Sequence, residues 1–126
     1  MTATLEHTNL TVTNADATAA RLCALFGWHI RWSGPAINGG YTVHVGDDDR
    51  YLAVFTPKTP AAPSPSSYDT VSGLNHIGIV VDDLQAVETR VRAAGLTPHS
   101  HAEYEPGRRF YFDDPDGIEF EVVAYD

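Results

Sequence analysis

The sequence predicts an α+β fold made of two βαβββ modules in tandem, whose mixed sheets enclose a cleft. The first observation is an internal repeat: LEHTNLTV at residues 5–12 recurs as LNHIGIVV at residues 74–81, with a histidine at the same place in both. The second is a helical pattern after each copy, and the third is a set of three strand-like segments that closes each half.

The repeat sets the expected domain organisation. A chain of 126 residues has the usual size of one domain, so we predict a single domain over residues 1–126. Module 1 is expected at about 1–57 and module 2 at about 73–126. The segment between them, about 58–72, is rich in Pro, Ser and Ala, which is typical of a linker.

The first strand of each half alternates between two faces. In module 1, Leu10 points to one side, whereas His7, Asn9 and Thr11 point to the other. In module 2, Ile77, Ile79 and Val81 take the apolar side.

A helix is expected after each first strand. Asn14 can cap the first helix and Gly27 can end it, while Asp83 and Gly95 have these places in the second. The predicted apolar stripes are Ala15, Ala19, Leu22 and Phe26 in the first helix, and Leu84, Val87, Val91 and Ala94 in the second.

Three more strands complete each predicted module. They are expected at about 28–33, 40–46 and 51–57, and at about 99–104, 108–113 and 118–125. With one helix per module, one face of each mixed sheet is covered and the other is open. His7 and His76 point to the open face.

The last strand adds a carboxylate to that face. Phe120 and Val122 suit the face under the helix, which places Glu121 on the open one. Aligning GDDDRYLAV at residues 46–54 with PDGIEFEVV at residues 115–123 makes Leu52 the counterpart of Glu121.

The open face therefore offers two imidazoles and one carboxylate, His7, His76 and Glu121. This set can hold a divalent metal ion (Fe, Mn, Ni, Co or Zn) and leaves coordination positions for substrate or water. The alternative is that the histidines are ordinary polar residues of a repeated architecture.

Other residues are candidates for substrate binding. Asn9 and Thr11 flank His7 and can orient a substrate, Arg108 in the loop EPGRRF can pair with a substrate anion, and Tyr111 can wall a pocket. His44 is either a further ligand or base, or a surface or structural residue.

A second histidine pair lies near the start of the sixth predicted strand. His99 and His101 are expected to share one face, which Glu103 continues. An H-x-H pair can bind metal, and the alternative is a solvated strand face.

The composition argues against some classes of binding partner. A net charge of −9 and a pI near 4.9 argue against nucleic acid and anionic membranes, and no apolar run approaches the length of a membrane span. The N-terminus does not read as a signal peptide, and the lone Cys23 excludes an intrachain disulfide. We expect a cytoplasmic protein.

Taken together, these residues resemble the vicinal oxygen chelate superfamily, which contains glyoxalase I, extradiol dioxygenases and bleomycin-resistance proteins. The most specific match is FYFDDPDGIEFEVV at residues 110–123. The resemblance implies that Glu121, His7 and His76 are metal ligands, and that the chain forms a homodimer.

The resemblance also implies a function. It is that of a divalent-metal-dependent enzyme acting on a small oxygen-bearing substrate, with the metal chelating adjacent substrate oxygens. The segment RYLAVF lacks the fourth ligand of glyoxalase I, so dioxygenase-like chemistry precedes glyoxalase-like or lyase chemistry among the expected reactions. The alternative is a metal-free small-molecule binding protein of the bleomycin-resistance type.

Overall fold

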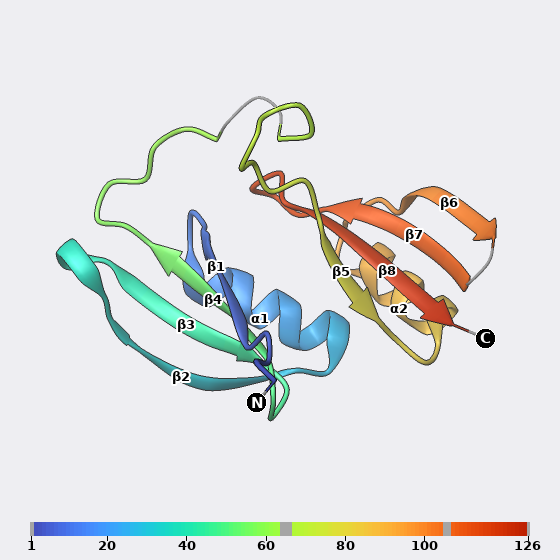
Figure 1. Cartoon of the computed structure of the whole chain (residues 1–126), viewed down its shortest axis with the longest axis horizontal. Helices are drawn as coiled ribbons and strands as arrows, with labels where there is room; N and C mark the ends of the chain where they lie inside the picture. Colours follow the sequence, from blue (N-terminus) through green and yellow to red (C-terminus); the bar gives the residue numbers. More distant parts are fainter. Residues whose placement is uncertain (1, 64–66, 105–106, 126) are drawn as a thin grey trace. The chain divides into compact units, whose positions relative to one another are not determined.

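The structure is a computed structural model that describes residues 2–63, 67–104 and 107–125 (Figure 1). The chain forms two compact units, Met1–Ala61 and Ala62–Asp126. Each unit contains one predicted module, and we call the units module 1 and module 2. The prediction that residues 1–126 form a single domain, and that of an enclosed cleft, stay predictions.

Module 1 contains one mixed sheet and one long helix. The sheet has the order β1-β4-β3-β2, in which β1 runs parallel to β4 and the other neighbours are antiparallel. The elements are β1 (His7–Thr11), α1 (Ala15–Phe26), β2 (His29–Pro35), the 3-10 turn η1 (Ile37–Gly39), β3 (Tyr41–Gly46) and β4 (Tyr51–Thr56).

Module 2 repeats this arrangement. Its sheet has the order β5-β8-β7-β6, with β5 parallel to β8. The elements are β5 (Ile77–Val80), α2 (Leu84–Ala93), β6 (His99–Tyr104), β7 (Gly107–Asp113) and β8 (Glu119–Tyr125). The predicted fold class, an α+β fold of two tandem βαβββ modules with mixed sheets, is confirmed.

The predicted helix caps are present. The Asn14 side chain accepts a hydrogen bond from the amide of Ala17 at 3.1 Å, and Gly27 adopts the left-handed conformation that ends α1. In α2, Asp83 accepts from the amide of Ala86 at 3.0 Å.

The buried helix faces differ from the predicted stripes at three positions, one of which is the half-buried Leu84. Phe26 is only half-buried, and Ala94 is exposed because α2 ends at Ala93. The buried residues of α1 are Ala15, Thr18, Ala19, Leu22 and Leu25, and those of α2 are Val87 and Val91.

Each core lies between a helix and one sheet face. In module 1, Val43, Val45 and Val54 are fully buried. In module 2, three phenylalanines and two valines are fully buried, and each such side chain contributes about 1.5–3 kcal/mol. These five residues are Phe110, Phe112, Phe120, Val91 and Val122.

The strand pairing corrects the expected correspondence between the modules. Thr8 pairs with Leu52 in module 1, and its repeat counterpart Ile77 pairs with Phe120 in module 2. Leu52 therefore corresponds to the buried Phe120, and Ala53 is the counterpart of Glu121. The sequence alignment was wrong by one residue, because the first and last strands are one residue closer in the sequence of module 2 than in that of module 1.

The predictions of a linker and of no membrane span can be compared with the described residues only. Residues 64–66 of the expected linker lie outside them. Within the described ranges, no helix is long and apolar enough to cross a membrane.

Candidate metal site

Glu121 lies on the open face of module 2 because its neighbours on β8 occupy the core. Phe120 and Val122 are buried under α2, so strand alternation turns the Glu121 carboxylate to the other face. It lies between Tyr111 of β7 and Gly78 of β5 in the sheet register.

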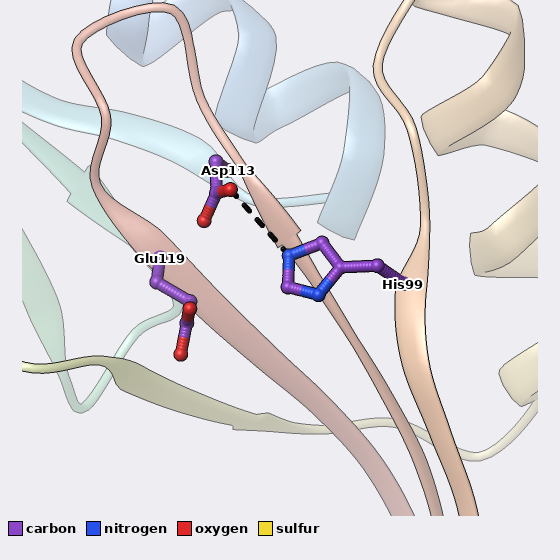
Figure 2. Close-up of side chains that lie close together, drawn as sticks. All are labelled: His99, Asp113 and Glu119. Carbon is purple, nitrogen blue, oxygen red and sulfur yellow. Dashed lines mark ion pairs between the residues drawn. The ribbon is translucent and has the colours of Figure 1, made fainter.

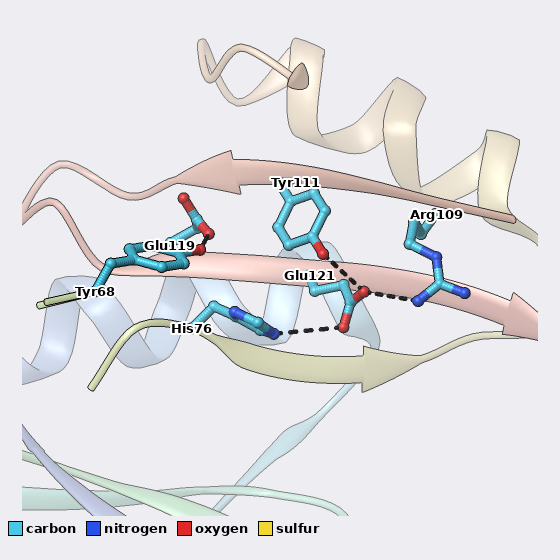
Figure 3. A network of polar contacts seen from close by, with 6 residues as sticks. All are labelled: Tyr68, His76, Arg109, Tyr111, Glu119 and Glu121. Carbon is cyan, nitrogen blue, oxygen red and sulfur yellow. Dashed lines mark hydrogen bonds and ion pairs between the residues drawn. The ribbon is translucent and has the colours of Figure 1, made fainter. Parts of the chain in front are cut away.

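One oxygen of this carboxylate is held by two donors (Figure 3). Arg109 Nη1 donates to Glu121 Oε2 at 3.0 Å, and the Tyr111 hydroxyl donates to the same oxygen at 3.0 Å. The side chains of Arg109 and Glu121 are only 12% and 15% exposed, so this charged pair is largely shielded from water. A shielded, charge-assisted pair fixes the orientation of the carboxylate.

The other oxygen faces a histidine. His76 Nε2 lies 3.6 Å from Glu121 Oε1, from a position immediately before β5 (Figure 3). The His76 ring packs edge-on against Tyr111, with ring centroids 5.6 Å apart. Its Nδ1 is buried and has no hydrogen-bond partner among the residues that the structure describes. Module 2 therefore brings two of the three predicted ligands together.

The third predicted ligand, His7, belongs to module 1. Its Nδ1 contacts Glu6 Oε1 at 2.8 Å, and its ring stacks on Tyr51 with centroids 4.8 Å apart. The hydrogen bond with His7 lowers the pKa of the Glu6 carboxyl. Asn9 and Thr11 are exposed on the same strand. Whether these three residues complete a site with His76 and Glu121 stays a prediction.

The strand register places His44 on the open face of module 1. Its ring stacks on Tyr51 at 4.6 Å and contacts Trp32 at 5.2 Å, while Arg31 lies over the Tyr51 ring at 4.6 Å. Burial lowers the pKa of His44, and the charges of His7 and Arg31 lower it further. This imidazole therefore stays neutral to lower pH than an ordinary histidine.

Arg109, rather than Arg108, contacts Glu121. Phe110 and Phe112 face the core, so alternation puts Arg109 and Tyr111 on the open face and turns Arg108 away from it. Arg108 is exposed and lines a cavity of about 280 Å³ under α2. The pattern of the two phenylalanines was a usable signal that sequence reasoning missed.

The expectation that His99 and His101 share one strand face is wrong. The register of β6 against β7 shifts between His99 and Ala102, and Ser100 has a positive φ of 55°. This bulge sends His99 toward Tyr111 on the open face, whereas His101 Nε2 bonds Glu88 Oε1 of α2 at 2.8 Å. The two imidazoles therefore lie on opposite faces of the sheet.

Two further residues beside His76 were not singled out as binding residues from the sequence. The Tyr68 hydroxyl donates to Glu119 Oε1, which raises the pKa of Tyr68 to about 12. The Tyr68 ring lies 6.5 Å from that of His76, in centroid distance (Figure 3). Tyr68 comes from the segment predicted to be a linker, so nothing in its local sequence indicated this contact.

The arrangement in module 2 suits a metal-binding carboxylate. Its Oε2 is engaged by Arg109 and Tyr111, and its Oε1 lies near an imidazole nitrogen. Gly78 leaves the space beside Oε1 open. A Cβ at position 78 would lie 3.5 Å from that oxygen. An imidazole and an oriented carboxylate are ligands that divalent first-row metals accept.

Comparison with known proteins gives a family match. The model of the Glyoxalase/Bleomycin resistance protein/Dioxygenase superfamily matches residues 4–122. No curated protein matches the sequence.

Several solved structures have the same fold at low sequence identity. A glyoxylase/bleomycin resistance protein/dioxygenase domain from Frankia sp. EAN1pec has a TM-score of 0.82 at 20% identity, covering 100% of both chains. The fosfomycin resistance protein FosX from Listeria monocytogenes, complexed with Mn(II) and sulfate, has a TM-score of 0.76 at 20% identity, covering 100% of this chain and 95% of that one. The oxidase ChaP-H2 has a TM-score of 0.73 at 22% identity, covering 100% and 96%.

Proposed function

We propose that this chain, which belongs to the Glyoxalase/Bleomycin resistance protein/Dioxygenase superfamily, is a divalent-metal-dependent enzyme that acts on a small oxygen-bearing substrate. His7, His76 and Glu121 hold the metal. The observation that carries the proposal is the Glu121 carboxylate, fixed through one oxygen and directed through the other toward His76 Nε2.

The donor set fits such a metal. Two neutral imidazoles and one carboxylate bind Mn, Fe, Co, Ni or Zn and leave positions open for substrate. Ala53, at the counterpart of Glu121, supplies no fourth ligand. The bound ion would supply Lewis-acid chemistry, polarising a substrate oxygen.

The protein's own groups have separate tasks in this proposal. Tyr111 and Arg109 keep Glu121 oriented, because both donate to its Oε2. Asn9 and Thr11 contact the substrate from module 1. We assign the anion-pairing role expected of Arg108 to Arg109, because Arg109 is the arginine on the face of Glu121.

The first test is metal content. Protein purified without chelator or affinity tag is analysed by elemental mass spectrometry, next to His7→Ala, His76→Ala and Glu121→Gln. We expect each variant to lose one equivalent of metal relative to the wild type. His101→Ala is the matched control, because its imidazole bonds Glu88 on the helix side, and its metal content should equal that of the wild type.

The identity of the metal then directs the search for the reaction. The Listeria relative is described as a complex with Mn(II), so Mn(II) is the first ion for reconstitution. Iron or manganese leads to catechol-type substrates with oxygen uptake as the readout, and nickel or zinc leads to thiol hemiacetals. Bound metal that is unchanged in all three variants would overturn this ligand set. No metal in any sample, even after reconstitution, would overturn the proposal in favour of a metal-free binding protein.

Two expectations about the whole protein accompany this proposal. We propose a homodimer in the cytoplasm. Size-exclusion chromatography with light scattering tests the homodimer, and a monomer at micromolar concentration would contradict it.

A further inference from the structure

We propose that His99, Asp113 and Glu119 form a second divalent-metal site, separate from the predicted ligands His7, His76 and Glu121. The ligand atoms of the three residues all lie within 4.8 Å of one another (Figure 2). His99 Nε2 is 3.5 Å from Asp113 Oδ2. The site lies entirely within module 2, at the end of the sheet where β7 turns into β8.

The bulge in β6 prepares the imidazole for binding. Because Ser100 has a positive φ, its hydroxyl reaches His99 Nδ1 at 2.8 Å. With Nδ1 as the hydrogen-bonded nitrogen, Nε2 is the one turned toward the carboxylates, and it is buried without a hydrogen-bond partner among the described residues. A neutral imidazole with its other nitrogen held in this way is the form that binds a metal.

The two carboxylates of the cluster lie directly opposite one another on neighbouring strands. Asp113 and Glu119 are direct partners in the antiparallel pairing of β7 with β8. Like charges directly opposite one another destabilise a sheet, and a divalent cation between them would reverse that repulsion. The Tyr68 hydroxyl donates to Glu119 Oε1, which orients the carboxylate.

The donor chemistry selects the class of ion. One imidazole and two carboxylates suit Mn, Co, Ni or Zn, with water in the remaining positions. The Asp113 side chain is 54% exposed, so the ion would exchange with solvent more readily than one at Glu121. Glu119 and Glu121 are two residues apart on one strand face, so a cation at the second site lies next to the Glu121 network.

Module 1 provides an internal control for this reading. The positions that correspond to His99, Asp113 and Glu119 in the register of module 1 are Trp32, Gly46 and Tyr51. None of these side chains is a metal ligand. The cluster therefore does not follow from the shared backbone alone.

The experiment is Co(II) and Mn(II) titration of chelator-treated protein by calorimetry. We expect two equivalents in the wild type and one in His99→Ala. Asp113→Asn, which keeps the side-chain size, should also lose one equivalent. The control is His29→Ala: His29 Nε2 lies 3.4 Å from Asp48 Oδ1, a similar pair without a third ligand among the described residues, and this variant should bind two.

The outcomes separate this site from the proposed function. One equivalent that is lost in His99→Ala but kept in His76→Ala would support the second site and overturn the proposed ligand set. One equivalent that is lost in His76→Ala and kept in His99→Ala would overturn the second site. Circular dichroism of each variant checks folding, and the wild-type stoichiometry is independent of any variant.

Discussion

The open faces of the two modules differ although their backbones repeat the same order of elements. Module 1 has a row of rings, in which Tyr51 stacks between His7 and His44 and Trp32 contacts His44. Module 2 has a charged network centred on Glu121. The core faces of both sheets are apolar, so the difference is confined to the side away from the helices.

A comparison by strand register shows where the difference arises. The two first-strand histidines, His7 and His76, correspond to each other. At three other positions module 1 has a small or aromatic side chain where module 2 has a charged one, and at a fourth module 1 has a histidine where module 2 has a tyrosine. The pairs are Ala53 with Glu121, Thr42 with Arg109, His44 with Tyr111, and Tyr51 with Glu119. A carboxylate and the arginine that orients it thus occur together in module 2, and both are missing at the matching places of module 1.

The largest expected effect comes from giving module 1 the carboxylate of module 2. Ala53→Glu places an ionisable group at a position that is 2% exposed, opposite His44 and without an arginine at the Arg109 counterpart. We expect the free energy of unfolding in chelator to fall by about 2–3 kcal/mol, because a buried charge is added to a packed site. Urea unfolding measures the loss.

The metal dependence of that loss sharpens the comparison. If the carboxylate reaches the metal that we propose is held by His7, His76 and Glu121, added Mn(II) should restore part of the lost stability of Ala53→Glu. Ala53→Gln has nearly the same size without the charge, so its unfolding should gain no more from Mn(II) than that of the wild type. Equal gains in both variants would contradict the idea that position 53 faces the site.

Much of the fold could be predicted from the sequence because local signals agreed with the tertiary structure. Asn14 and Asp83 are capping residues directly before apolar stripes, and both cap a helix in the structure. The alternation of Phe120 and Val122 placed Glu121 on the open face without any knowledge of the sheet. The family followed from these residues and from the DPDG turn, and the match over residues 4–122 confirms it.

The errors came from features that have no local signal. Ser100 adopts a positive φ, which a serine seldom does, so the bulge that separates His99 from His101 could not be read from strand alternation. The first and last strands are one residue closer in the sequence of module 2 than in that of module 1, and this misassigned Leu52. The Tyr68 contact joins residues 51 positions apart, and only tertiary folding brings them together.

A smaller effect is expected where each helix contacts its sheet through polar side chains. In module 2, Glu88 bonds His101 at 2.8 Å and Arg92 at 3.2 Å; in module 1, the Tyr41 hydroxyl donates to Asp16 at 3.2 Å. Burial acts to raise the pKa of Glu88, but the bonds from His101 and Arg92 outweigh it, so the pKa is lowered. Glu88→Gln should therefore cost about 1 kcal/mol at neutral pH.

The pH dependence identifies the cause of that cost. A carboxyl whose pKa is lowered by folding stabilises the protein above its unfolded value, near 4.5, and this stabilisation is lost as the pH falls through the folded value. The gap between the wild type and Glu88→Gln should thus close as the pH falls below 4.5. Asp16→Asn, the control, keeps an acceptor for Tyr41 and should cost less. A gap that stays constant down to about pH 3 would show that packing, rather than charge, is responsible.

The smallest effects are expected from changes of charge at the helix caps, where the modules are most alike. Asn14 and Asp83 accept amide hydrogen bonds of 3.1 and 3.0 Å, so Asn14→Ala and Asp83→Ala should each cost about 1 kcal/mol in urea unfolding. The two caps differ in the charge around them. The first turn of α1 already carries Asp16, whereas that of α2 has no acidic residue beyond its cap.

Asp83→Asn should therefore cost roughly 0.3–0.5 kcal/mol through loss of the favourable interaction with the helix dipole. Asn14→Asp should gain less than that, because the new carboxylate lies two residues from Asp16 and the two repel each other. The salt dependence tests whether these effects are electrostatic. The stability changes of Asp83→Asn and Asn14→Asp should both shrink in about 1 M NaCl, while the costs of the alanine variants persist. Equal and opposite effects of the two substitutions at low salt would show that Asp16 does not influence the start of α1, and that the caps, unlike the open faces, are interchangeable between the modules.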